Sequence, residues 1–143
     1  MMYARFHTVT VRDDSGNNVE VALRFTALSN IKLKKKYNVE GRALFISAFD
    51  DDERLIDILN ESLNWKDNEN AIKSGVELFE RIVDTDGLGV FSRQKLLVNI
   101  ATASGIFDDD ERDYMLSAIE EDKVAFFNRK IKKNPEAKTE KNA

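Results

Sequence analysis

The chain has 143 residues, 42% hydrophobic and 34% charged, which is typical of one globular domain rather than of a disordered chain or a membrane protein. It contains no cysteine, which excludes disulfides, thiolate metal sites and a cysteine nucleophile. Its formal net charge of −4 gives no general attraction for nucleic acid or anionic lipid. All apolar runs are shorter than a membrane-spanning helix, and no apolar signal core follows Met1, so we expect a soluble protein of the cytoplasm.

The N-terminal segment, about residues 4–25, alternates with the period of β-strands. Val9 and Val11 share one side of a first strand, and the polar run Asp13–Asn18 is typical of a turn. The return strand has one clearly apolar side, formed by Val19, Val21, Leu23 and Phe25. An isolated two-stranded hairpin is only marginally stable, so this one must pack on helices or on another chain.

After the hairpin the apolar period becomes that of helices. Thr26 is the expected cap of a first, lysine-rich helix that ends near Asn38 and Gly41. Its expected core contacts are Leu28, Ile31 and Leu33. The apolar segment Ala43–Phe49 then leads into a second helix, which starts in an acidic run, carries Leu55, Ile58, Leu59 and Leu63, and ends around Trp65.

Three further helices are expected. Asn68 or Asn70 starts a core helix with Ile72, Val76, Leu78, Phe79, Ile82 and Val83. Ser92 caps the next helix, and Gly105 ends it. The last helix starts in Asp108–Glu111 and runs to Ile131, with Asn134–Ala143 as a charged, disordered tail. The predicted fold is therefore mainly α with a small N-terminal β-hairpin: a single-domain bundle of about five to six helices over residues 1–133.

A hexapeptide occurs twice, at Phe49–Arg54 and at Phe107–Arg112. Its acidic residues could bind a hard cation, but acids at the positive end of a helix dipole are a commoner arrangement, so we interpret both copies as helix starts. Asp84–Gly89 resembles a calcium loop but lacks its ligands at the fifth and twelfth positions. The lone histidine, His7, has no second histidine or cysteine with which to form a catalytic or zinc site. We therefore predict no catalytic, cofactor-binding or metal residues.

The lysine cluster of the first helix comprises Lys32, Lys34, Lys35 and Lys36, followed by Tyr37. Such a cluster could contact phosphates while the aromatic ring stacks on a base. A solvated face near the negative end of a helix explains it better in an acidic protein. Nucleic acid is therefore not an expected partner, and Lys32 and Lys35 are candidate protein-binding residues.

The segment Val19–Tyr37 combines a hairpin strand, the junction of Phe25 with Thr26 and a lysine-rich first helix. In this it resembles the tail assembly chaperones of long-tailed bacteriophages and prophages of Gram-positive hosts, over about Val11–Phe127. The resemblance implies a non-enzymatic protein of the host cytoplasm that keeps the tape measure protein soluble, helps to recruit tail tube subunits and is absent from the finished virion. Many members have a simpler hairpin turn and more glycine and proline.

A helical protein without a reactive site must act through its surface. Phe126 and Phe127 are the main candidates for a partner-binding or self-association surface, because adjacent residues lie about 100° apart around a helix and cannot share one narrow core stripe. Either one ring stays exposed or a broad groove buries both. The hairpin edge is a candidate for self-association by strand addition. The alternative function is a phage or bacterial regulatory adaptor that binds protein or nucleic acid through the lysine-rich helix.

Overall fold

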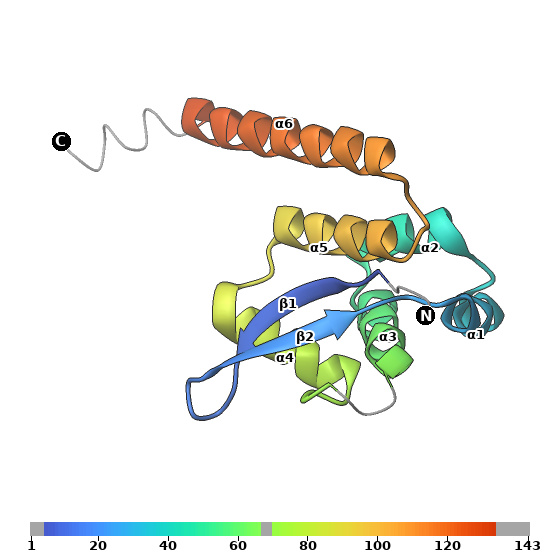
Figure 1. The fold of residues 1–143 in the computed structure, drawn as a ribbon. Coiled ribbons are helices and arrows are strands. Elements are labelled where there is room, and N and C mark those ends of the chain that lie inside the picture. Colours follow the sequence, from blue (N-terminus) through green and yellow to red (C-terminus); the bar gives the residue numbers. More distant parts are fainter. Residues whose placement is uncertain (1–4, 67–69, 134–143) are drawn as a thin grey trace.

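The structure is a computed structural model that describes residues 5–66 and 70–133. Within these residues an N-terminal hairpin precedes six α-helices in a single compact body, which confirms the predicted fold class (Figure 1). The predicted tail, residues 134–143, lies outside the described part. The elements are β1 (His7–Arg12), β2 (Asn18–Leu23), α1 (Ala27–Tyr37), α2 (Gly41–Ser47), η1 (Ala48–Asp50), α3 (Asp52–Leu63), η2 (Asn64–Lys66), α4 (Gly75–Asp86), α5 (Val90–Ala103) and α6 (Asp109–Lys133).

The hairpin pairs β1 with β2 in antiparallel register, with Val9 opposite Val21. The Asp13 carboxylate closes the turn by accepting backbone hydrogen bonds of 2.9 Å from Ser15 and from Asn17. One face of the two strands carries the apolar side chains and packs on α3, α4 and α5. Of the two expected supports, helices or another chain, the structure shows helices.

The outer edge of β2 is closed by side chains that follow α3. The buried Asn70 amide accepts a hydrogen bond of 3.1 Å from the Ala22 N–H and donates to the carbonyl oxygens of Ala22 (3.2 Å) and Leu63 (3.0 Å). The Trp65 indole donates a second hydrogen bond of 3.1 Å to the Ala22 carbonyl. These contacts satisfy backbone groups that an open strand edge would leave unpaired.

Helix α4 begins later than predicted. It starts at Gly75, and the hydroxyl of Ser74 caps its first turn. Asn70 therefore closes the β2 edge instead of starting the helix, and Asn68 lies outside the described residues. A Cβ atom on Gly75 would lie 2.3 Å from the Ile56 carbonyl oxygen, so only glycine lets α4 approach α3 this closely.

Helix α1 has the predicted ends but not the predicted contacts. Thr26 caps it, and Asn38 terminates it in the left-handed conformation with φ of 57°. Leu33 is buried as expected, whereas Leu28 and Ile31 are 61% and 51% exposed. Their assignment to the core is wrong because α1 packs on α3 with its opposite side.

The structure confirms both acidic hexapeptides as helix starts. Asp51 caps α3 by accepting a hydrogen bond of 3.0 Å from the Arg54 N–H. Asp108 caps α6 through the Glu111 N–H at 2.7 Å, and the Glu111 carboxylate accepts in return from the Asp108 N–H at 3.2 Å. This reciprocal pair is a capping box, which satisfies two backbone donors that the first helical turn leaves free. The apolar segment Ala43–Phe49 forms α2 and part of η1.

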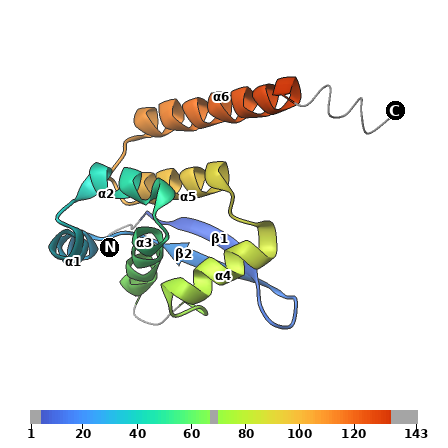
Figure 2. The ribbon, with the colours of Figure 1, turned by 180° about the vertical axis from the view of Figure 1, so that it is seen from behind.

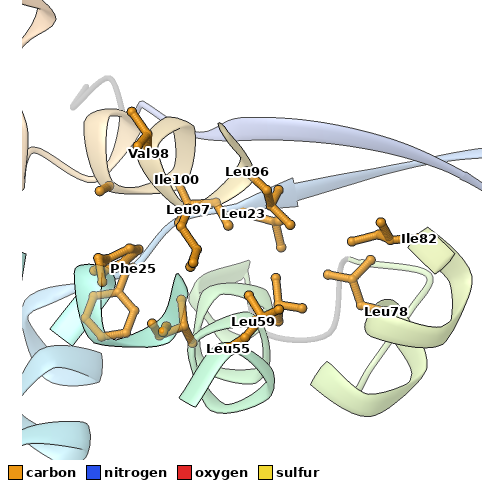
Figure 3. Close-up of a cluster of buried hydrophobic side chains, with 14 of the residues drawn as sticks. Leu23, Phe25, Leu55, Leu59, Leu78, Ile82, Leu96, Leu97, Val98 and Ile100 are labelled. Carbon is orange, nitrogen blue, oxygen red and sulfur yellow. The ribbon is translucent and has the colours of Figure 1, made fainter. Parts of the chain in front are cut away.

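The core lies between the hairpin and α2 to α5, with smaller contributions from α1 and α6. The predicted core position Ile82 is buried, but Phe79 is only partly buried, because the neighbouring Leu78 takes the inward position on α4. Val76 and Val83, on the expected stripe, are exposed. Figure 3 shows buried side chains from these elements, among them Leu23, Phe25, Leu55, Leu59, Leu78, Ile82, Leu96, Leu97 and Ile100, with Val98 on the other side of α5.

Helix α5 starts at Val90 with Gly89 at the N-cap. The prediction that Ser92 caps this helix is therefore wrong, and Ser92 lies in its first turn. Gly105 follows its C-terminal end with φ of 82°, as expected. Helix α6 then runs back along α5, and its C-terminal part extends past the start of α5 (Figures 1 and 2). No helix in the described ranges is long and apolar enough to cross a membrane.

Candidate protein-binding surfaces

Phe126 contacts both Phe91 and Phe127 where α6 passes the start of α5. The ring centroids of Phe126 and Phe91 are 5.9 Å apart, and those of Phe126 and Phe127 are 5.6 Å apart, with interplanar angles of 65° and 76°. Such edge-on arrangements are favourable for aromatic rings. We call these three residues the aromatic patch. Phe126 is 44% exposed and Phe127 48%, so the alternative in which a groove buries both rings is wrong, and both remain open to solvent.

Further apolar side chains lie near the aromatic patch. Val90 is 62% exposed beside Phe91 in the chain, and Val124 is 55% exposed one turn before Phe127. A groove of about 590 Å³ leads from Val90 to Ile46 on α2 and is also lined by Phe49, Asp50, Leu88, Gly89, Arg93 and Gln94. Neighbouring exposed apolar side chains of this kind are found at interaction surfaces.

A second apolar groove of about 490 Å³ lies between α2 and the start of α6. Ile46 lines it as well, so the two grooves adjoin. Tyr114, 76% exposed, stands at its edge. At one wall the Arg42 guanidinium pairs with the Glu111 carboxylate at 2.7 Å and lies 5.9 Å from the Phe107 ring. The arrangement suits binding of apolar side chains.

Three of the four clustered lysines have carboxylate partners. Lys34 lies 3.3 Å from Glu40, and Lys36 lies 2.8 Å from Asp57 and 3.1 Å from Glu53. Lys32 is 3.8 Å from Glu61, a long ion pair. Lys35 has no ion-pair partner among the described residues and is exposed. Carboxylates of α3 and of Glu40 thus neutralise much of the cluster, which weakens the case for phosphate binding.

Tyr37 anchors α1 to α3. Its hydroxyl donates a hydrogen bond of 2.5 Å to the Asp57 carboxylate, and Arg54 lies 4.8 Å from its ring centroid. Burial, followed by the bond to Asp57, raises the pKa of Tyr37 to about 12. Lys36 also donates a hydrogen bond to Asp57, and this bond raises the pKa of Lys36. Tyr37 is held by Asp57 and Arg54, so its ring is not available to stack on a base.

The other candidate residues of the sequence analysis, His7 and Asp84, lie within a strand and a helix. His7 lies in β1, and burial lowers its pKa. Asp84 is inside α4 rather than in a loop, and the neighbouring Thr85 hydroxyl accepts a hydrogen bond of 2.9 Å from the Arg12 N–H. Within residues 5–66 and 70–133, no group of three or more histidine, aspartate or glutamate side chains could hold a metal ion.

No protein-family model, curated protein or solved structure matches this chain.

The sequence pattern missed some surface residues. Phe91 completes the aromatic patch but lies ahead of the helix start predicted at Ser92, so the pattern did not place it on the helix. Leu28 and Ile31 belong to the surface rather than the core. The signal was present in α1 itself: Leu28, Ile31, Lys32 and Lys35 follow the spacing of one helix face, and that face cannot be buried with two lysines on it.

Proposed function

We propose that this protein is a non-enzymatic tail assembly chaperone of a long-tailed bacteriophage or prophage, which binds the tape measure protein and helps to recruit tail tube subunits in the host cytoplasm. The observation that carries this proposal is the aromatic patch. Phe126 and Phe127 remain about half exposed on a helix that extends past its supporting neighbour, together with Phe91. The resemblance of Val19–Tyr37 to that family supplies the identity of the partner.

The patch fits a chaperone of an elongated helical protein. Aromatic side chains bury much area at little cost in conformational entropy, so they are favoured as anchors in binding surfaces. The adjoining grooves at Ile46 offer apolar contacts beside α2, one at the start of α5 and the other at the start of α6. Several copies that each bind weakly along one long chain would hold it strongly by multivalency.

Co-purification tests this proposal. The protein would be co-expressed with the tape measure and tail tube proteins of the same genome, and both should be recovered with it. Phe127→Ala should lower recovery of the tape measure protein. Val76→Ala is the control, because it removes an exposed apolar side chain from α4, outside the aromatic patch and the two grooves beside it. Recovery of neither tail protein with the wild-type chain would contradict the proposal, and equal losses for both variants would contradict the role of the patch.

A further inference from the structure

Helix α1 carries a mixed apolar and basic stripe on the side that faces away from the core. The members of this stripe recur at i, i+3, i+4 and i+7, so they lie on one side of the helix over about two turns. All four are exposed, while Ser29 and Leu33 on the opposite side are buried. We call this stripe the α1 face; it consists of Leu28, Ile31, Lys32 and Lys35.

The α1 face borders a groove. The groove has a volume of about 520 Å³ and lies between α1 and the C-terminal end of α3. Leu28 and Lys32 contribute to one wall, and Glu61, Asn64 and Trp65 to the other. Figures 1 and 2 show α1 at the periphery of the molecule, at the end opposite to the C-terminal end of α6, so a partner can approach it without meeting the aromatic patch.

The lysines of the α1 face are the two that the fold uses least. Lys34 and Lys36, on the flanks of the helix, form ion pairs of 3.3 Å and 2.8 Å with Glu40 and Asp57. Lys32 has only the pair of 3.8 Å with Glu61, and Lys35 has none among the described residues. Two weakly committed positive charges therefore lie beside two apolar side chains.

We propose that the α1 face and its groove dock an amphipathic helix of a partner protein whose apolar side chains are flanked by acidic ones. Leu28 and Ile31, 61% and 51% exposed, match an apolar stripe in area and chemistry. Lys32 and Lys35 match carboxylates beside that stripe. A helix laid into such a groove is a recurrent mode of peptide recognition, with anchors one and two turns apart.

The observations favour a protein over a nucleic acid at this surface. Two of the four outward residues are apolar. Contact with a hydrated phosphate backbone would not remove their surface from water, so it would bring no hydrophobic stabilisation. The opposite wall contains the Glu61 carboxylate, which would repel phosphates. Tyr37, the nearby aromatic residue, is held by Asp57 and Arg54. An acidic helix meets none of these obstacles if its carboxylates lie on the lysine side.

A titration with designed peptides tests the proposal. The probe is a helical peptide of about four turns, with leucines along one stripe and glutamates along one side of it, so that the glutamates can face the lysines while the other side faces Glu61. Trp65, the single tryptophan, lines the groove and supplies an intrinsic fluorescence signal. The peptide should bind, and added salt should weaken binding because exposed charges contribute. A peptide with lysines in place of the glutamates, and a single-stranded oligonucleotide, should not bind.

Variants locate the binding. Lys32→Glu combined with Lys35→Glu should weaken the peptide at least about tenfold, and Leu28→Ser should weaken it similarly. Lys34→Glu introduces the same charge reversal outside the α1 face, and Val76→Ser removes an exposed apolar side chain from α4; both should leave binding unchanged. Phe127→Ala should also have no effect, which separates this surface from the aromatic patch.

Four results would overturn the proposal: no binding of the acidic peptide, equal binding of the lysine peptide, oligonucleotide binding that depends on Lys32 and Lys35, or self-association of the chain that is lost with these two lysines. The last two would assign the surface to a nucleic acid or to a second copy. Far-ultraviolet circular dichroism of each variant verifies that the helices remain folded.

Discussion

Replacing Asn70 by alanine should lower the free energy of unfolding by about 2–4 kcal/mol, because the amide joins β2 to the end of α3. The substitution removes three hydrogen bonds, of 3.1 Å, 3.2 Å and 3.0 Å. The Ala22 carbonyl keeps its bond from Trp65, but the Ala22 N–H loses its partner, and the Leu63 carbonyl loses its bond from the amide. A buried polar group left unpaired costs roughly 1–3 kcal/mol and each further lost hydrogen bond roughly 0.5–1.5 kcal/mol, which together account for the expected loss.

Asn70→Asp is a sharper version of the same experiment. The carboxylate can still accept the Ala22 N–H, but it places negative oxygen against the carbonyls of Ala22 and Leu63. These contacts and burial should raise the pKa of the new carboxyl in the folded state above its ordinary value of about 3.9. Its protonated form can donate a hydrogen bond. The stability of the variant relative to wild type should therefore be highest below that ordinary value and fall as pH rises through the folded-state pKa.

Urea denaturation followed by circular dichroism measures both effects, and the difference between variant and wild type at each pH cancels most of the titration of other groups. Asn128→Ala, at an exposed position of α6, is the control and should change stability little. A loss below about 0.5 kcal/mol for Asn70→Ala would refute the reasoning. So would a relative stability of Asn70→Asp that does not depend on pH.

Five other substitutions test the packing, the Tyr37 contact and the helix caps. Leu78→Ala should cost about 2–5 kcal/mol because Leu78 is fully buried, and Phe79→Ala should cost less because part of its ring is already exposed; the reverse order in urea melts would show that the inward side of α4 is misassigned. Tyr37 has a pKa raised to about 12, so its contribution to stability should be present below the ordinary tyrosine value of about 10 and be lost as pH rises toward 12, and Tyr37→Phe should lack that loss in alkaline unfolding curves. Asp51→Ala and Asp108→Ala should each cost about 1 kcal/mol by removing a cap, and melting temperatures with calcium or with a chelator should coincide; a metal-dependent shift would instead favour a cation site.

The sequence predicted those parts of the fold that depend on local signals. The Thr26 cap, the two acidic helix starts, the glycine after α5 and the alternating hairpin all report on residues that are close together in the chain. Their backbone preferences and hydrogen bonds do not require knowledge of distant partners. These features are where prediction and structure agree.

The incorrect assignments depend on contacts between distant segments. Asn70 is a residue type that favours helix caps, but its amide binds the backbone of Ala22 at the edge of β2. No periodicity in the chain predicts this contact. Leu28 and Ile31 have the helical spacing of core residues, but α1 packs on α3 with its opposite side, so both remain exposed. Phe91 belongs to the aromatic patch because α6 packs along α5, a contact that the local sequence does not predict.

The proposed function requires that this chain keeps a long partner in solution by binding it through the aromatic patch. The soluble yield of the tape measure protein tests this when it is co-expressed with wild-type chain, with Phe126→Ala combined with Phe127→Ala, or with Val76→Ala on α4. The yield should be high with wild type and with Val76→Ala, and low with the double variant, while that variant retains its circular dichroism spectrum and most of its stability because both rings are about half exposed. A yield that is the same with the folded double variant as with wild type would contradict the proposed function.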